Sequence, residues 1–326
     1  MRPYHAAAGL IVLAGIATAG WLATHRGQSD PVLEPWSEIG GYPWLIPGLA
    51  EATVHVIDRP HEMNEAMRAR TWLTRVGRSR VYHLSTNSLR LRGPETGAKV
   101  KGTQRILVIG ESVAHGWGLE AEDTWTVKLE AELRGRGMPT EVLNAGVPSA
   151  FSEAMRGFCM AKAPALAPDV VVWMRRPVGP GGAQALATGA RDCAAATRAR
   201  LLVVLPPIST FDAHGATVYG SEARGIRERL PGVDVIELTD VFRAAQQGKG
   251  EVLVHRGDRA VVVDQETGKV WLDVPWSAQG LDATIYALFE DEPAVREALF
   301  FDEGHPDEAG TTVLASALAD RLGPQR

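Results

Sequence analysis

The chain has 326 residues, 45% hydrophobic and 22% charged, which suits one sizeable domain with extra segments or two small domains. Its net charge of -5 argues against nucleic acid as the main partner, because nucleic-acid-binding proteins carry a basic face. Only two cysteines are present, without zinc or redox spacing, which excludes a cysteine-based metal site.

An uncharged, largely apolar run occupies residues 6–24. As a helix it would span roughly 28 Å, close to the ~30 Å hydrocarbon core of a bilayer. Residues 1–27 are therefore predicted to be a signal anchor, with Trp21 near the membrane interface, or a signal peptide cleaved near Ala17-Thr18-Ala19. A buried core helix is the third interpretation. Either of the first two exports the protein, so we expect it outside the cytoplasm, in the periplasm or at the cell surface, membrane-anchored or secreted.

Residues 28–100 are expected to form a tether and a small β-rich extension. The stretch from 29 to 48 contains Pro and Trp residues and is typical of an irregular lead-in. Alternating apolar residues at 54–57 and 81–84 predict short strands. The histidines of this region match no metal-ligand spacing, so no metal site is expected.

From residue 101 the pattern changes to short apolar runs separated by helical segments. The expected strands are residues 105–110, 141–143, 169–173, 201–205 and 233–236. The expected helices are residues 122–136, 152–162, 184–198, 222–230 and 307–322. Strands separated by helices pair in parallel, so residues 101–326 are predicted to form an α/β sandwich around a parallel sheet. Residues 251–292 break the pattern and predict a hairpin insertion, with strands at 260–264 and 269–272.

Cys159 and Cys193 both lie in expected helices that precede strands. In an oxidising compartment they form one disulfide, and otherwise they are two buried thiols. The sequence leaves both alternatives open.

Ser112 follows the first expected strand, at the end of the run Arg105-Ile106-Leu107-Val108-Ile109-Gly110-Glu111-Ser112. In an open parallel sheet, ligands bind where loops leave the carboxyl ends of the strands, which favours a nucleophile here. A serine at this place also caps helices, which is the alternative. The nearby glycines match neither a dinucleotide nor a phosphate-loop fingerprint, so no cofactor is expected. His115 either touches substrate or only lines the turn.

Asp302 precedes His305 by three residues, and Pro306 suits the first position of a helix. At this spacing the carboxylate can hold the Nδ1 proton and leave Nε2 facing the serine. In isolation the motif also fits an exposed histidine with an acidic neighbour. Together with Ser112 it predicts a nucleophile, a general base and an orienting acid.

These motifs resemble the SGNH (GDSL) hydrolase superfamily over about residues 87–322. The matching residues are Gly110-Glu111-Ser112 with Gly116-Trp117-Gly118 (Glu111 where Asp is usual), Gly146, and Asp302 to Pro306. Residues 86–93 are similar to the lead-in of exported, membrane-tethered members. The resemblance implies a flavodoxin-like three-layer α/β/α fold with a Ser112-His305-Asp302 site. It also implies that the backbone N–H groups of Ser112 and Gly146 bind the oxyanion.

The third family block departs from the usual Gly-x-Asn-Asp, because Met174-Arg175-Arg176-Pro177 stands at its place. No asparagine is available there as the third oxyanion donor, a loss typically worth ~10²–10³ in rate. Arg175 or Arg176 takes this role, since a guanidinium is a strong donor to negative charge. Alternatively, both are surface residues at a strand end.

The resemblance predicts an extracytoplasmic serine esterase that acts through an acyl-enzyme on a small-molecule or glycan ester. One alternative is an O-acyltransferase or deacetylase acting on a cell-envelope glycan. Another is a catalytically inactive glycan-binding or scaffold member. Substrate identity and oligomeric state are left open.

Overall fold

The computed structural model describes residues 36–39, 42–45, 47–56, 80–177, 182–212, 222–277, 281–292, 294–302 and 304–323. The predicted anchor or signal segment at 1–27 lies outside these residues. Within them, no helix has the length and apolar character needed to cross a bilayer.

A five-stranded sheet with parallel neighbours forms the centre of the molecule, in the order β6-β5-β7-β8-β9. Its strands are β5 (Gln104–Gly110), β6 (Thr140–Gly146), β7 (Val170–Met174), β8 (Arg200–Leu205) and β9 (Asp234–Glu237). This is the 2-1-3-4-5 order of flavodoxin-like folds. β5 and β7 are buried along almost their whole length, as continuous apolar runs covered on both faces should be. The predicted parallel α/β fold is confirmed.

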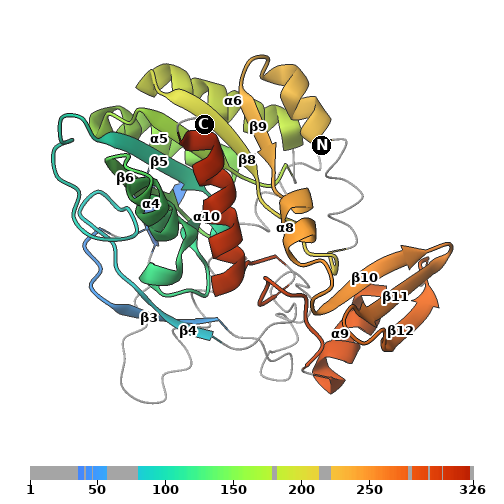
Figure 1. Cartoon of the computed structure of the whole chain (residues 1–326). Helices are drawn as coiled ribbons and strands as arrows, with labels where there is room; N and C mark the ends of the chain where they lie inside the picture. Colours follow the sequence, from blue (N-terminus) through green and yellow to red (C-terminus); the bar gives the residue numbers. More distant parts are fainter. Residues whose placement is uncertain are drawn as a thin grey trace, which may run out of the picture.

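Helices cover both faces of the sheet (Figure 1). One face carries α4 (Trp125–Gly135), α8 (Thr239–Ala245) and α10 (Glu308–Leu322), and the other carries α5 (Ser152–Leu166) and α6 (Gly182–Thr197). Successive side chains of a strand point to opposite faces. Ile106 and Val108 accordingly pack with the first group of helices, and Leu107 and Ile109 with the second.

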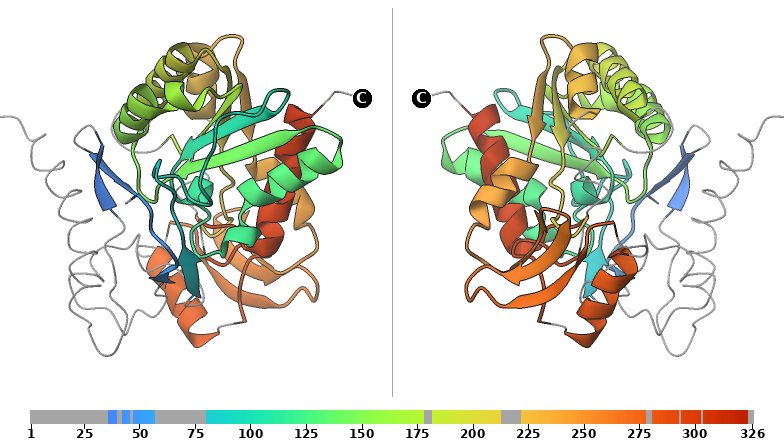
Figure 2. Two further views of the ribbon diagram at one scale, coloured as in Figure 1. Left: turned by 90° about the vertical axis from the view of Figure 1, so that its left-hand side faces the viewer. Right: turned by 90° about the vertical axis from the view of Figure 1, so that its right-hand side faces the viewer.

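The described part of the N-terminal extension contains two antiparallel strand pairs. β1 (Trp36–Ile39) pairs with β2 (Tyr42–Leu45), and β3 (Ala52–Val56) pairs with β4 (Arg80–Leu84), so strands form at both predicted places. The β1–β2 hairpin lies at the side of the body (Figure 2). Leu45, Tyr82, Leu84 and Leu91 are buried in the same core as the α5 and α6 face. The extension therefore shares the core of the sheet domain.

The insertion is larger than the predicted hairpin. β11 (Arg259–Asp264) and β12 (Val270–Pro275) pair as expected, but β10 (Glu251–Arg256) adds a third antiparallel strand, and α9 (Leu281–Asp291) packs on the sheet. Gly257, at φ +62°, makes the tight turn between β10 and β11, and neither this turn nor β10 was predicted. This antiparallel lobe projects from one end of the body (Figures 1 and 2).

Cys159 of α5 and Cys193 of α6 are bonded as a disulfide, with their Cα atoms 5.4 Å apart. Both side chains are fully buried. Of the two alternatives left open by the sequence, the structure has the disulfide.

Candidate active site

The turn after β5 places Ser112 at the carboxyl end of the sheet. Gly110 ends the strand, and a Cβ atom there would overlap Ala114 and the carbonyl of Met174, so only glycine fits. Helix α3 (Ser112–His115) begins immediately afterwards. Glu111 occupies its N-cap position and no side chain caps the helix, so the helix-cap interpretation of Ser112 is wrong.

The hydroxyl of Ser112 points to His305 instead, with 2.8 Å between Oγ and Nε2. On the other side of the ring, Nδ1 lies 2.7 Å and 2.9 Å from the two carboxylate oxygens of Asp302. An ionised carboxylate only accepts hydrogen bonds, so Nδ1 carries the proton and Nε2 accepts from the Ser112 hydroxyl. The structure thus brings the three predicted residues together in the predicted order.

Asp302 also closes the turn that carries the histidine. Its Oδ1 atom accepts the backbone N–H groups of Gly304, at 2.8 Å, and His305, at 2.7 Å. Asp307 then caps α10 by accepting from the N–H of Gly310. One short sequence segment therefore orients the imidazole and starts the last helix.

Two further side chains support the imidazole. The ring of Phe301 stacks on His305 with 5.7 Å between centroids and 17° between planes. The guanidinium of Arg80, from β4, lies 4.3 Å from the centroid of Phe301 and pairs with Glu308 at 2.7 Å. Sequence reasoning missed Arg80, because no local pattern links it to a helix 228 residues later.

His115 is buried behind the nucleophile turn, and its side chain hydrogen-bonds to groups other than Ser112. Its Nδ1 lies 3.0 Å from the carbonyl of Gly146, and its Nε2 lies 3.3 Å from the hydroxyl of Tyr82. Because a carbonyl only accepts, Nδ1 donates and the tyrosine hydroxyl donates to Nε2. Burial, reinforced by the charge of Arg92, holds the pKa of His115 well below its usual range. His115 therefore lines the turn, which is one of the two alternatives that the sequence left open.

Arg92 fixes the segment after α3. Its buried guanidinium donates to the carbonyls of His115 and Gly116, at 2.8 Å each, and of Leu119, at 2.5 Å. These carbonyls lie at or after the end of α3, where helical N–H partners run out. Two of them have one further donor each: Asn144 Nδ2 for His115 (3.3 Å) and the N–H of Leu119 for Gly116 (3.2 Å). The sequence showed two arginines in the 86–93 stretch, Arg90 and Arg92, but nothing that indicated their partners.

Of the two backbone groups expected to bind an oxyanion, one is already engaged. The N–H of Gly146 donates to Oδ1 of Asn144 at 2.9 Å, which conflicts with its predicted role. Gly146 is still required as glycine, because a Cβ atom would overlap the backbone of His115. The N–H of Ser112 lies at the start of α3, and no residue of the described part accepts it.

Arg175 and Arg176 stand at the carboxyl end of β7, where the resemblance led us to expect an asparagine. The Arg175 side chain is only 11% exposed, which rules out the surface interpretation for it. It donates to the carbonyl of Ala150 and lies 3.5 Å from Glu111. The Glu111 carboxylate also accepts the backbone N–H of Arg176 at 2.9 Å.

The Arg176 side chain takes a different direction. Its guanidinium pairs with Asp212 at 3.0 Å and donates to the carbonyl of Gly304 at 3.4 Å. Arg176 thus contacts the loop that carries His305.

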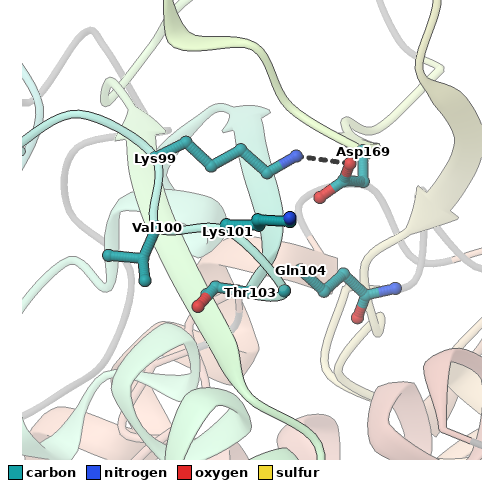
Figure 3. Close-up of a pocket in the computed structure, with 7 residues that line it drawn as sticks. Lys99, Val100, Lys101, Thr103, Gln104 and Asp169 are labelled. Carbon is teal, nitrogen blue, oxygen red and sulfur yellow. Dashed lines mark hydrogen bonds and ion pairs between the residues drawn. The ribbon is translucent and has the colours of Figure 1, made fainter.

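Two cavities lie among the described residues, and only the smaller one is next to His305. An open cavity of about 530 Å³ lies at the amino ends of β5 and β7, where Lys99 reaches Asp169 (Figure 3), so it is at the opposite end of the strands from Ser112. A cavity of about 10 Å³ touches His305 and has room for about one water molecule. Among the described residues, no cluster of His, Cys, Asp or Glu side chains is arranged to hold a metal ion.

No protein-family model and no curated protein matches the chain. Solved structures similar to it include a GDSL-family lipolytic protein from Desulfitobacterium hafniense (12% identity, TM-score 0.40, covering 66% of this chain and 98% of that one). A lipase/acylhydrolase from Enterococcus faecalis has 13% identity and a TM-score of 0.43, covering 67% and 95%. An acetylxylan esterase from Geobacillus stearothermophilus has 12% identity and a TM-score of 0.43, covering 68% and 95%. The solved structures that this chain resembles are thus GDSL-type proteins and ester hydrolases.

Proposed function

We propose that this protein is a serine ester hydrolase that works through an acyl-enzyme. The observation that carries the proposal is the chain of hydrogen bonds from Ser112 through His305 to Asp302, with heavy-atom distances of 2.8 Å and 2.7 Å. These are the contacts needed for a base to take the serine proton and for a carboxylate to hold the base in the right tautomer.

The reaction follows from these contacts. His305 Nε2 accepts the Ser112 proton as Oγ bonds to the ester carbonyl carbon. Asp302 stabilises the resulting imidazolium, and the N–H of Ser112 donates to the oxyanion. The imidazolium then protonates the leaving alcohol. Water repeats the sequence on the acyl-enzyme and releases the acid.

The place of action is proposed to be outside the cytoplasm. The disulfide between Cys159 and Cys193 supports this location, because such bonds persist in oxidising compartments. The apolar run at residues 6–24 supports it as well. Anchoring in the membrane through that run belongs to the same proposal. Fractionation of cells into periplasm, membrane and cytoplasm tests it, and recovery of the protein only in the cytoplasm contradicts it.

Replacing the nucleophile tests the activity. Ser112→Ala should reduce turnover of p-nitrophenyl acetate to background while the thermal unfolding curve stays close to that of the wild type. Labelling with a fluorophosphonate should occur in the wild type and disappear in this variant. Ser88→Ala, which changes an exposed serine bonded to Glu95, is the matched control and should keep both signals.

Two outcomes contradict the proposal. Turnover that survives in Ser112→Ala excludes the serine mechanism. A wild-type protein that neither labels nor hydrolyses favours the inactive scaffold alternative. Adding acetylated and free oligosaccharides separates ester hydrolysis, which releases free acid, from acyl transfer to a sugar hydroxyl.

A further inference from the structure

We propose that Arg175 is a catalytic residue of this site and donates to the oxyanion together with the N–H of Ser112. This inference rests on the proposed function. The third family block of this chain lacks the asparagine that would donate to the oxyanion. Of the two neighbouring arginines at that place, Arg175 takes over this role.

The strand register brings Arg175 next to Glu111, the residue that precedes the nucleophile. β5 and β7 pair in parallel with Gly110 opposite Met174, so the next residues, Glu111 and Arg175, leave the sheet side by side. The Arg175 guanidinium spans from Glu111 to the carbonyl of Ala150 in the loop after β6. It therefore links the loop that carries Ser112 to the loop where the family places its second donor.

The site needs such a donor. With the Gly146 amide bonded to Asn144, the N–H of Ser112 is the one remaining backbone donor of the two predicted. A guanidinium has five N–H groups, and the Arg175 contacts within the described residues use only Nη1. Nε and Nη2 are left to donate. A charged donor in a half-buried site stabilises a developing oxyanion more strongly than a neutral amide does.

Glu111 holds the guanidinium of Arg175 in place. One of its carboxylate oxygens accepts the backbone N–H of Arg176, and the other lies against Arg175. The carboxylate thus ties the end of β7 to the residue before the nucleophile. Glu111 is a positioning residue, and it stands where the family usually has the shorter aspartate.

Arg176 does not fill the same role. Asp212 and the carbonyl of Gly304 engage its guanidinium, which holds it against the histidine loop. The two adjacent arginines thus act on different parts of the site.

The donor acts in two steps. When Ser112 Oγ bonds to the carbonyl carbon, the π electron pair moves to the carbonyl oxygen, and this oxyanion accepts N–H groups from Ser112 and Arg175. When the pair returns, the bond to the alcohol oxygen breaks, and that oxygen takes the proton from His305. Arg175 keeps its own proton throughout, because a guanidinium stays charged.

The test compares Arg175→Gln, Arg175→Lys and Arg175→Ala with the wild type on p-nitrophenyl acetate. Arg175→Gln should lower kcat by ~10²–10³, with KM changed much less, because the contact forms in the transition state. Arg175→Lys should retain more activity than Arg175→Gln. Guanidinium chloride at low millimolar concentration should partly restore Arg175→Ala, which a variant damaged in folding would not show.

Arg156→Gln is the matched control, because Arg156 pairs with Asp192 on the surface of α5 and α6. It should keep wild-type kcat and should not respond to guanidinium. Wild-type kcat in Arg175→Gln overturns the inference. So does a rise in KM confined to negatively charged esters with kcat preserved, because Arg175 would then bind substrate only.

The inference and the proposed function fail differently. If the wild type hydrolyses esters and labels at Ser112 while Arg175→Gln retains full kcat, only the role of Arg175 is lost. If the wild type shows no Ser112-dependent turnover or labelling, both are overturned.

Discussion

At the scale of single residues, the site combines one contact made within a turn, between Asp302 and His305, with one made between distant segments, from His305 to Ser112. Asp302 and His305 lie three residues apart, so their contact follows from one turn. The bond from His305 to Ser112 crosses 193 residues and was expected only because two motifs of one family were both present. The hydrogen bond from the Gly146 amide to the side chain of Asn144 was not predicted, because no backbone pattern specifies that acceptor.

The buried His115 should make stability depend on pH. Its folded-state pKa lies well below 6.5, so it stays neutral in the folded protein while the unfolded chain takes up a proton as pH falls through that value. The stability it contributes is therefore present above pH 6.5 and is lost below it. We expect the free energy of unfolding to fall by up to about 1.4 kcal/mol per pH unit below 6.5 from this residue.

Urea unfolding at several pH values between 7.5 and 5.5 measures this slope. His115→Gln should be less stable at pH 7.5 but should show a shallower slope. Ser88→Ala, which changes an exposed side chain that does not titrate, is the control and should leave the slope as in the wild type. An unchanged slope in His115→Gln would show that other groups cause the pH dependence.

At the scale of elements, the predicted strands and helices of the sheet domain have the predicted type, but α8 was not predicted and some boundaries differ. β5 and β7 were evident because buried parallel strands are continuous apolar runs. α5 continues to Leu166, beyond the predicted end at 162, with Pro164 in its last turn. A proline removes one backbone N–H, which the final turn of a helix tolerates better than its middle. β10 was missed because the tight turn at Gly257, which joins it to β11, was not recognised.

The disulfide between α5 and α6 should make stability depend on redox conditions. It closes a loop with a sequence separation of 34 residues, for which the chain-entropy model gives about 4 kcal/mol. Reducing the wild type with dithiothreitol should therefore lower the free energy of unfolding by about this amount.

Chemical denaturation with and without reductant measures the difference. The double variant Cys159→Ala, Cys193→Ala is the control and should show no response to dithiothreitol. Mass spectrometry shows whether the disulfide of the wild type is reduced. If it is reduced and the unfolding curve does not change, the disulfide does not contribute the expected free energy of unfolding.

At the scale of the whole molecule, the extension and the sheet domain are one folding unit. Tyr82, Leu84 and Leu91 lie before residue 101 and are at most 1% exposed. Burying each large apolar side chain contributes ~1.5–3 kcal/mol, and a domain has only ~5–15 kcal/mol of net stability. Arg92, which holds the turn after α3, also precedes residue 101.

We therefore expect a shortened protein consisting of residues 101–326 to be insoluble or unfolded and to lack esterase activity. A second shortened protein, residues 28–326, keeps all the described contacts and should fold and hydrolyse p-nitrophenyl acetate. Circular dichroism and turnover of both proteins test this pair. A folded, active 101–326 protein would show that the extension is dispensable.

The stack of Arg80, Phe301 and His305 has a consequence for biosynthesis. Arg80 comes from β4, the nucleophile from the turn after β5, and the base from the segment before α10. None of these segments can position the others until all three have been synthesised and packed. A chain still emerging from the ribosome or crossing a membrane would therefore carry Ser112 without its base, and ester cleavage would begin only when the C-terminal helix docks.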